Sequence, residues 1–254
     1  MASEDLIKEL AAFSTPTVVD AIEFFGVRPK DDGYIAGEIV CRVPELGVRI
    51  GYAATMSYRT DRPADPSGPI DFEAYMEHVL SVPGPRFLVG EDQSERPAGV
   101  VTGEINATLH KALGSVGYIT NGGIRDLDAF PSLGFQAYSA FVHVSTGYGH
   151  MTGFGEPVTI QGVEIRPGDL LHADVHGICL VPPDIAADLP KACREVQAAE
   201  LEALRESRSP SFSPAGYVKA RERYRNRLLE LRHHYQDVIR CRSHSSIQEA
   251  KNSS

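Results

Sequence analysis

An arginine and an aspartate stand side by side at Arg125 and Asp126, after a pair of glycines in the stretch NGGIRD, residues 121–126. The planar guanidinium of an arginine binds a carboxylate through two parallel hydrogen bonds. An aspartate is a suitable oxygen ligand for a hard cation such as Mg²⁺ or Mn²⁺. The glycines allow a tight turn or a close approach of the backbone to a ligand. The stretch therefore predicts a site for a small carboxylate and a metal ion, with a surface turn closed by an Arg/Asp pair as the alternative.

A second stretch, upstream of the first, offers backbone groups for the same carboxylate. Gly103 and Glu104 stand in front of a segment with helical spacing, EINATLHKALGSV. The first N–H groups of a helix have no partner inside the helix, and the helix dipole favours anions at that end. We therefore expect the backbone N–H groups of Ile105 and Asn106 to form an anion-binding cradle.

Strands and helices alternate around these two stretches. A helical pattern over residues 71–82 is followed by a buried strand at 85–92, by the helix that begins near residue 104, and by a strand at 117–120 that leads into NGGIRD. Parallel α/β sheets bind ligands beyond the carboxyl ends of their strands. Both stretches are therefore expected to line one crevice.

The remaining segments predict further strands and two more helices within the same domain. Residues 14–26, STPTVVDAIEFFG, have the N-cap residue, early proline and terminal glycine of a helix. Strand-like segments lie between about residues 136 and 182, and a helix follows at about 184–206. The mixture of strands and helices indicates an α/β domain over residues 1–206.

The C-terminal residues differ in character from this domain. A Ser/Pro stretch at 209–214 precedes a charge-dense helical segment, and the final residues are polar. We expect a helical extension over residues 207–240 and a disordered tail over 241–254.

Composition excludes several classes of function. The 254 residues carry a formal net charge of -9, whereas proteins that bind nucleic acid backbones usually cluster lysine and arginine. The four cysteines form no CxxC pair, which favours reduced thiols in a cytoplasmic protein over a zinc site or a disulfide framework. The first residues lack the pattern of a secretory signal, and no apolar run reaches the length of a membrane span. We expect neither nucleic acid nor membrane as a partner, and no export.

Four stretches together resemble one protein family. They cover roughly residues 10–205, in the order STPTVVDAI, GYAATM, GVVTGEINATLHKALGSVGYITNGGIRD and GVEIRPGDLLHADVHGICLVP. The family joins the class II pyruvate aldolases that act on 4-hydroxy-4-methyl-2-oxoglutarate with the RraA-like regulators of RNase E. The third stretch is the most specific, because it combines Gly-Glu with Gly-Gly-x-Arg-Asp.

The resemblance implies a layered α/β sandwich of the phosphohistidine-domain-like (RraA-like) type, here with an appended C-terminal helix. It also implies homotrimers or homohexamers with active sites at subunit interfaces. Among the matched residues, Arg125 would bind the pyruvyl carboxylate, Asp126 would bind the metal, and Glu104 would be an acidic residue beside the site. The backbone from Gly103 through Ile105 to Asn106 matches the loop that also holds the carboxylate.

The implied reaction is retro-aldol cleavage of a 4-hydroxy-2-oxo acid to pyruvate by a lyase that depends on Mg²⁺ or Mn²⁺. The metal would act as a Lewis acid, and Arg125 would orient the substrate carboxylate and offset its charge. Oxaloacetate decarboxylation shares the enolpyruvate intermediate and is expected as a side activity. Glu104, acting through a water molecule, is the candidate proton acceptor and a second catalytic residue. A Schiff-base route is less favoured, because Lys111 is the only lysine near either stretch.

Two histidine-bearing stretches are further candidates. HADVHG places His172, Asp174 and His176 at alternate positions, where a strand would direct all three to one face as metal ligands. The favoured alternative is that Asp174 caps or bridges within a hairpin. HVSTGYGHMTG, with His143 and His150, fits a lid or substrate-selecting loop as well as a plain surface loop. The family tends to have an arginine near the position of His143, so the specificity pocket and the substrate's distal half stay open.

Three functions remain on sequence grounds. The first is the metal-dependent lyase, favoured because Arg125, Asp126 and Glu104 are all present. The second is a non-catalytic RraA-type regulator that acts by protein binding. The third is a related metal lyase or hydrolase that acts on another small carboxylic acid. Fold alone does not choose between them.

Overall fold

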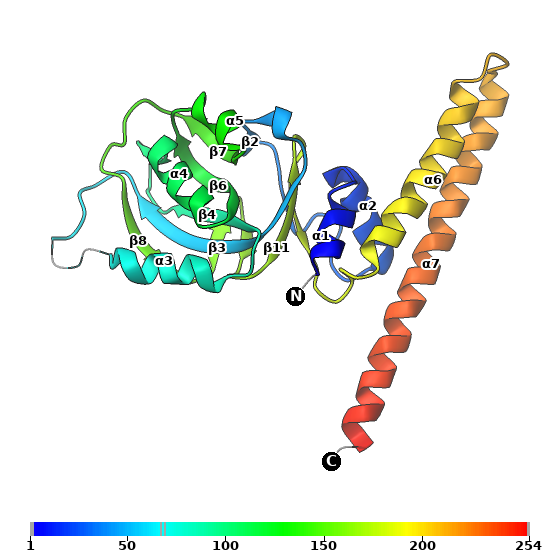
Figure 1. Ribbon diagram of the computed structural model, residues 1–254. Coiled ribbons are helices and arrows are strands. Elements are labelled where there is room, and N and C mark those ends of the chain that lie inside the picture. Colours follow the sequence, from blue (N-terminus) through cyan, green and yellow to red (C-terminus); the bar gives the residue numbers. More distant parts are fainter. Residues whose placement is uncertain (1–2, 67, 69, 253–254) are drawn as a thin grey trace. The chain divides into compact units, whose positions relative to one another are not determined.

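The chain is divided into two compact units. The computed structural model describes residues 3–66, 68 and 70–252. One unit is the α/β segment Asp32–Val181, and the other combines Met1–Asp31 with Pro182–Ser254 and is helical (Figure 1). The sequence instead predicts one domain over residues 1–206. The structure divides the chain after Asp31 and after Val181.

The α/β unit is built around one large sheet. Within the described residues, ten strands form this sheet, and β9 and β10 pair separately as a hairpin. The elements in chain order are β1 (Tyr34–Ile35), β2 (Val40–Cys41), a 3-10 helix (Pro44–Leu46), β3 (Arg49–Arg59), α3 (Phe72–Ser81), β4 (Arg86–Asp92), β5 (Val100–Thr102), α4 (Glu104–Ala112), β6 (Ser115–Ile124), α5 (Ala129–Leu133), β7 (Gln136–Val142), β8 (His150–Phe154), β9 (Val158–Ile160), β10 (Val163–Ile165), β11 (Leu170–Asp174) and β12 (Gly177–Val181). The predicted mixed α/β fold is confirmed.

The middle of the sheet is parallel and its flanks are antiparallel. The pairs β3–β4, β4–β6, β6–β7 and β5–β6 run parallel, whereas β11, β12, β1, β2 and β8 pair antiparallel with their neighbours. Val100 of β5 lies opposite Gly123 of β6. Because β5 and β6 are parallel, Gly103 and Arg125, which follow their last residues, leave the same edge of the sheet.

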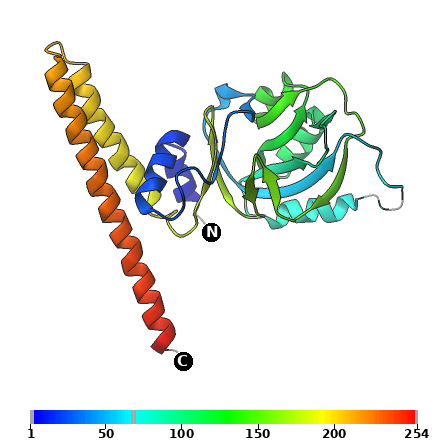
Figure 2. The ribbon, with the colours of Figure 1, turned by 180° about the vertical axis from the view of Figure 1, so that it is seen from behind.

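Each face of the sheet packs against a different layer. On one face, Phe87 and Val89 of β4 belong to a buried cluster with Val158 and Ile160 of the β9–β10 hairpin. On the other face, Sδ of Met56 lies 3.4 Å from the hydroxyl oxygen of Tyr75 in α3. The helices α3 and α4 lie in front of the sheet in Figure 1, and the opposite face is turned toward the viewer in Figure 2. This helical side contains the candidate site.

The two glycines of NGGIRD lie inside β6 rather than in a turn. A Cβ atom at Gly122 would lie 3.1 Å from Cγ1 of Val101, and one at Gly123 would lie 2.6 Å from Cε2 of Phe141. The glycines therefore let neighbouring strands approach closely. Neither has a left-handed φ, whereas Asp126 has a φ of 58°. The interpretation of these glycines as a surface turn is wrong, and the sharp change of direction comes after the strand.

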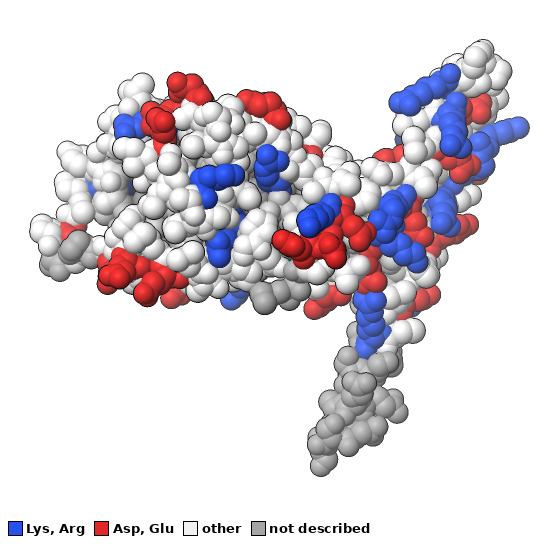
Figure 3. All heavy atoms as spheres, in the orientation of Figure 1, with Lys and Arg blue, Asp and Glu red and all other residues white. Residues whose placement is uncertain are grey.

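The helical unit contains α1 (Glu4–Leu10), α2 (Thr15–Phe25), α6 (Leu189–Ser207) and α7 (Pro214–Asn252). Helix α2 confirms the prediction for residues 14–26, since the side chain of Ser14 accepts a hydrogen bond from the backbone of Thr17 and Gly26 ends the helix with a φ of 64°. Among the described residues, no helix has both the length and the apolar character needed to span a bilayer. Lysine and arginine are interspersed with aspartate and glutamate on the visible face of α6 and α7 (Figure 3).

Packing among these helices explains where the unit boundary falls. Tyr235 of α7 is buried against Phe25 of α2 with ring centroids 4.6 Å apart, and its hydroxyl donates a 2.6 Å hydrogen bond to Oε2 of Glu195 in α6. Helices distant in sequence therefore share one core. Helix α7 continues through residues 241–252, where the sequence predicts disorder, because this segment has no glycine or proline that would end it. Residues 253–254 lie outside the described residues.

Candidate active site

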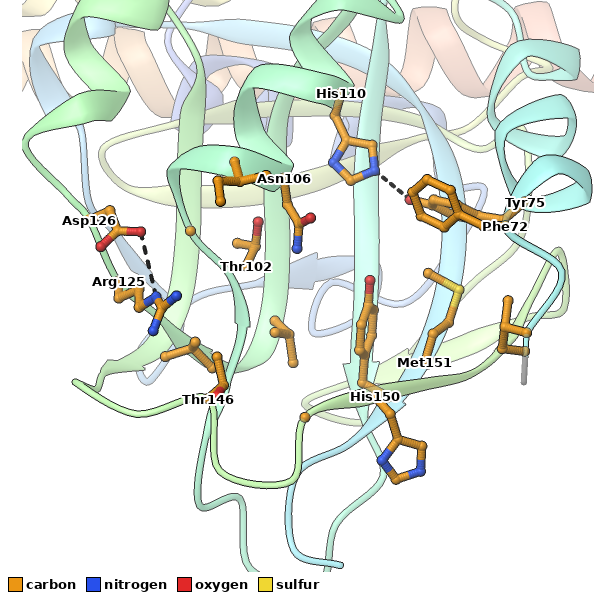
Figure 4. A pocket seen from close by; sticks show the side chains of 17 residues that line it. Phe72, Tyr75, Thr102, Asn106, His110, Arg125, Asp126, Thr146, His150 and Met151 are labelled. Carbon is orange, nitrogen blue, oxygen red and sulfur yellow. Dashed lines mark hydrogen bonds and ion pairs between the residues drawn. The ribbon is translucent and has the colours of Figure 1, made fainter. Parts of the chain in front are cut away.

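A pocket of about 360 Å³ lies where β5 and β6 end and α4 begins. The predicted residues that line it are Gly103, Ile105, Asn106, Arg125 and Asp126. In Figure 4, Arg125 and Asp126 lie at one end, and the side chain of Asn106 extends from α4 toward the space between the two ends. The parallel pairing of β5 with β6 thus unites two stretches that are separated by about twenty residues of chain.

Asp126 caps the helix that begins at Glu104. The helix α4 has Gly103 as its N-cap residue, which has no side chain to cap the helix. Oδ2 of Asp126 instead accepts a 3.1 Å hydrogen bond from the backbone N–H of Glu104. A carboxylate at this position is also favoured by the helix dipole. The left-handed φ of Asp126, which aspartate tolerates better than most residues, directs its side chain back toward the helix.

Gly103 makes room for the two charged side chains. A Cβ atom at this position would lie 2.5 Å from Oδ2 of Asp126 and 3.1 Å from Cγ of Arg125. Its φ of -154° is ordinary extended backbone, so the requirement for glycine is one of space. The site therefore depends on a residue that contributes no side chain.

Hydrogen-bond donors converge beside the capped aspartate. Nε of Arg125 lies 3.5 Å from Oδ2 of Asp126, and both side chains are about two-fifths exposed. Within the described residues, the Nη groups of Arg125 and the backbone N–H groups of Ile105 and Asn106 have no hydrogen-bond acceptor. These donors match a small carboxylate, which arginine binds in a fork and a helix N-terminus binds through its N–H groups.

One polar group beneath this cradle also lacks a partner. The side chain of Thr102 lines the pocket and is almost fully buried. Its Oγ1 has no hydrogen-bond partner within the described part of the chain. Buried hydroxyl groups are usually satisfied, so this hydroxyl suits a bound polar ligand or a water molecule that would complete its hydrogen bonding.

Glu104 occupies a different position from the other predicted residues. Its backbone N–H is engaged by Asp126, whereas its side chain is exposed and does not line the pocket. The Glu104 carboxylate is therefore not positioned to contact a ligand in the pocket directly. Any role in proton transfer would need an intervening water molecule.

The site fits a metal ion that is held mainly by water and substrate. No group of three or more histidine, cysteine, aspartate or glutamate side chains that could bind a metal exists among the described residues. Oδ1 of Asp126 makes no hydrogen bond or ion pair within the described residues, and its side chain is 42% exposed. One carboxylate oxygen with water molecules is a common way of binding Mg²⁺. The donor set thus suits a hydrated hard cation and not a zinc-type cage.

The opposite end of the pocket contains residues that sequence reasoning did not single out. Phe72 and Tyr75 of α3, His110 of α4 and Met151 of β8 lie there, apart from Arg125 and Asp126 (Figure 4). The hydroxyl of Tyr75 and Nε2 of His110 are 2.6 Å apart and hydrogen-bonded. Both residues stand on segments that the sequence predicts as helices. A histidine and a tyrosine on the apolar faces of two helices were the signal that could have identified them.

Burial controls the charge of this histidine. His110 is only 2% exposed, and desolvation lowers its pKa from 6.5 to about 4. Burial also raises the pKa of Tyr75 well above its usual value. Both members of the pair are therefore uncharged near neutral pH.

The HADVHG stretch forms a hairpin turn and not a metal site. His172 and Asp174 lie in β11, but the strand ends at Asp174, so His176 falls in the turn. Oδ1 of Asp174 accepts a 2.9 Å hydrogen bond from the backbone N–H of His176. The same oxygen lies 3.1 Å from Nδ1 of the His176 ring. The prediction that Asp174 bridges within the hairpin is confirmed. The shared face expected for all three residues is wrong, because the strand periodicity stops before the third.

The loop between β7 and β8 packs tightly against β5. The backbone N–H of Val100 donates to the carbonyl of Ser145 at 3.1 Å. A Cβ atom at Gly99 would lie 2.2 Å from the carbonyl oxygen of Thr146. His143 does not line the pocket, whereas Thr146 and His150 do. In Figure 4 the ring of His150 points away from the other labelled side chains.

Solved structures share this fold. An uncharacterized protein from Pseudomonas syringae pv. tomato str. DC3000 aligns with 87% of this chain and 94% of its own, with a TM-score of 0.68 and 24% identity. The protein RraAS2 from Streptomyces coelicolor, described as an unusual member of the RNase ES inhibitor RraA protein family, aligns with 79% of this chain and 96% of its own, with a TM-score of 0.61 and 22% identity. These likenesses define an RraA-like fold.

The sequence places the chain within a family. The RraA-like family, described as Aldolase/RraA, matches residues 15–180, and the chain belongs to it. A relative from Halalkalibacterium halodurans, named "Putative 4-hydroxy-4-methyl-2-oxoglutarate aldolase", is 29% identical over 101 residues, which are 39% of this chain and 47% of the relative. Protein DlpA of Legionella pneumophila is 23% identical over 185 residues, 71% of this chain and 28% of the relative. The chain thus spans about half, or less, of these relatives' lengths.

Proposed function

We propose that this protein is a divalent-metal-dependent lyase that cleaves a 4-hydroxy-2-oxo acid to pyruvate, with oxaloacetate decarboxylation as a side activity. The observation that carries the proposal is the convergence of Arg125, Asp126 and the N-terminus of α4 at one end of the pocket. Membership in the Aldolase/RraA family and the aldolase name of the relative from Halalkalibacterium halodurans support it.

The substrate's pyruvyl carboxylate would be bound by the donors that have no acceptor among the described residues. The Nη groups of Arg125 would bind its two oxygens, and the N–H groups of Ile105 and Asn106 would donate from the helix end. This binding fixes the direction of the keto group and the C3–C4 bond, which is the positioning that a cleavage reaction needs. The same positive groups offset the negative charge that develops during cleavage.

Asp126 would hold Mg²⁺ or Mn²⁺ through Oδ1, while Oδ2 keeps its hydrogen bond to the backbone of Glu104. The bound metal would supply Lewis-acid stabilisation of the charge that develops on the keto oxygen. Arg125, at 3.5 Å from Oδ2, reduces the negative charge at that oxygen. The capping hydrogen bond keeps the carboxylate in place whether or not a metal is bound.

The 4-hydroxyl group must lose a proton when the C3–C4 bond breaks. Glu104 is our candidate acceptor, acting through a water molecule, because its side chain is exposed beside the first turn of α4. A general base can act across one water molecule. The pocket-lining His110 is buried and paired with Tyr75, so it is not assigned this role.

The decisive experiment measures pyruvate release from oxaloacetate and from 4-hydroxy-2-oxo acids with and without a second carboxylate. The full chain is assayed with Mg²⁺, with Mn²⁺ and with EDTA, beside the Asp126→Asn variant. Release that EDTA and the substitution both abolish would support the lyase. If none of these acids releases more pyruvate with the protein than with the metal ion alone, the lyase proposal is refuted.

The same assay separates the lyase from the regulator. A non-catalytic RraA-type protein that acts by protein binding would release no pyruvate from any of these acids. We further propose a homotrimer or homohexamer, as the family resemblance implies. Light scattering of the full chain would show a mass near three or six times 27.7 kDa if this assembly exists.

A further inference from the structure

Asn106 contributes a side chain to the pocket as well as a backbone N–H. The residue lines the pocket and is exposed there, not packed into the core. An asparagine amide carries two N–H donors on Nδ2 and an acceptor oxygen, and it has no charge. The binding of a carboxylate by Arg125 and the end of α4 does not use this side chain, so its chemistry calls for a separate account.

The first turn of α4 directs the amide toward the reacting part of a bound substrate. Asn106 is the third residue of the helix, and the Cα–Cβ bonds of a helix tilt toward its N-terminus. In Figure 4 the side chain extends from α4 into the space between Arg125 and the aromatic residues of α3. When the C1 carboxylate of a 4-hydroxy-2-oxo acid is bound at the helix end, carbon C4 lies three bonds further along, beside the amide.

Elements of one chain fix this arrangement. Helix α4 follows β5, Arg125 follows β6, and the two strands pair in parallel. The 3.1 Å hydrogen bond from the backbone N–H of Glu104 to Asp126 joins the helix end to the residue after Arg125. A neighbouring subunit at the pocket would therefore add groups without separating Asn106 from the carboxylate end.

The other polar side chain that α4 directs into the pocket is already engaged. His110 stands four residues after Asn106, on the same face of the helix, and both line the pocket. The ring of His110 is buried and hydrogen-bonded to the hydroxyl of Tyr75 at 2.6 Å. Asn106 is thus the polar side chain of this helix that reaches a ligand in the middle of the pocket.

We propose that Asn106 is a catalytic residue whose Nδ2 donates a hydrogen bond to the 4-oxygen of a 4-hydroxy-2-oxo acid. This assignment rests on the proposed lyase function and specifies how the site recognises the group at the cleaved bond. Negative charge develops on the 4-oxygen as the hydroxyl loses its proton. A donor already in place stabilises that charge more than it stabilises the hydroxyl group.

The step is balanced without a further reactant. The 4-hydroxyl proton passes to water, and the 4-oxygen becomes the carbonyl oxygen of an aldehyde or ketone. The C3–C4 bond breaks, its electron pair forms the enolate of pyruvate, and the enolate takes up one proton. Nδ2 of Asn106 keeps its own protons throughout and remains hydrogen-bonded to the carbonyl oxygen of the product.

Two reactions at the same site separate this role from a general one. Cleavage of 4-hydroxy-2-oxopentanoate increases the negative charge on the oxygen at C4. Decarboxylation of oxaloacetate instead removes negative charge from the oxygens at C4, because the carboxylate leaves as neutral CO₂. A hydrogen-bond donor beside C4 should therefore accelerate only the first reaction.

Asn106→Leu removes the amide with little change in side-chain size. With the full chain and Mg²⁺, we expect kcat for 4-hydroxy-2-oxopentanoate to fall about 100-fold, the scale of one lost oxyanion donor. Oxaloacetate decarboxylation should be unchanged or faster. Thr108→Leu is the matched control and should retain both rates, because Thr108 is exposed on the same helix and does not line the pocket.

Exchange of the methyl protons of pyruvate with D₂O gives a second readout. This exchange passes through the same enolate and uses the carboxylate and keto groups, but pyruvate has no 4-oxygen. Proton NMR should show wild-type exchange in Asn106→Leu and slower exchange in Arg125→Lys. Loss of exchange in Asn106→Leu would mean that the substitution damages the carboxylate end, and it would overturn the role at C4.

Failure of this assignment differs from failure of the lyase. If Asn106→Leu slows both reactions equally, or cleaves the hydroxy acid at the wild-type rate, the assignment is overturned and the lyase stands. Wild-type protein that decarboxylates oxaloacetate but cleaves no 4-hydroxy-2-oxo acid would also overturn it. If the wild type releases pyruvate from neither kind of acid, the lyase proposal fails and the assignment fails with it.

Discussion

The carboxylate of Asp126 accepts a 3.1 Å hydrogen bond from the backbone N–H of Glu104, so one candidate site residue caps the helix that begins with the other. This contact fixes one carboxylate oxygen and leaves the other available in the described structure. It also directs the positive end of α4 toward the pocket that Arg125 lines. The helix end and the proposed metal ligand are thus one structural unit.

Removing the space at Gly103 should damage the site more than the fold. In Gly103→Ala, the new Cβ atom would lie 2.5 Å from Oδ2 of Asp126 and would displace that carboxylate. We expect a loss of pyruvate release on the order of 100-fold, the scale seen when a preorganised group is lost, and a smaller loss of stability, about 1 kcal/mol, because the displaced carboxylate no longer caps α4. Gly153→Ala is the control, since nothing lies within 4 Å of its Cβ position. Full activity in Gly103→Ala would contradict the arrangement.

Two substitutions of Asp126 should separate its two roles. Asp126→Asn keeps a side-chain oxygen for the N–H of Glu104 and tolerates the φ of 58°, whereas Asp126→Ala does neither. Both variants should lose metal-dependent turnover. Only Asp126→Ala should also lose stability, by about 1–3 kcal/mol for the cap and the left-handed backbone. Denaturant unfolding measures the difference, and equal stabilities would argue against the capping role.

Replacing Arg125 by lysine should impair catalysis even though the charge is kept. Lysine cannot bind a carboxylate in a fork, and its ammonium would not reproduce the guanidinium contact at 3.5 Å from Asp126. Loss of an oriented donor typically costs roughly 3–4 kcal/mol of transition-state stabilisation, and we expect Arg125→Lys to approach that loss. Steady-state kinetics with the best substrate would show it as a fall in kcat/KM. A variant with wild-type kcat/KM would remove Arg125 from the proposed site.

Burial of His110 predicts a pH-dependent loss of stability. Its pKa is about 4 in the folded protein and 6.5 when unperturbed. Between these values the unfolded chain binds more protons than the folded one, so stability falls as pH is lowered from about 6.5 to about 4. The full difference corresponds to roughly 3 kcal/mol.

The variant His110→Phe isolates this contribution. Denaturant unfolding at several pH values between 4 and 7 should show a shallower decline than in the wild type. His233→Asn, which changes an exposed histidine of α7, should follow the wild-type curve. Parallel curves for wild type and His110→Phe would mean that the buried ring does not resist protonation.

The sequence by itself determined the local structure and the chemical types at the site. Residues 14–26 have the cap, early proline and final glycine of a helix, and these act through neighbouring backbone groups, so α2 forms as predicted. The Arg125–Asp126 pair and the start of α4 could also be recognised from the sequence. A guanidinium, a carboxylate and a helix N-terminus have the same binding preferences wherever they occur.

Tertiary structure alone decided how these parts meet. The hydrogen bond from Glu104 to Asp126 joins residues 22 positions apart, and the one between Tyr75 and His110 joins residues 35 positions apart. Both contacts depend on strand pairing and helix packing, which short-range patterns do not encode. The same reason explains why the paired His110 and Tyr75 are uncharged near neutral pH. Whether His110 is charged depends on how deeply the fold buries it, a property of packing and not of residue type.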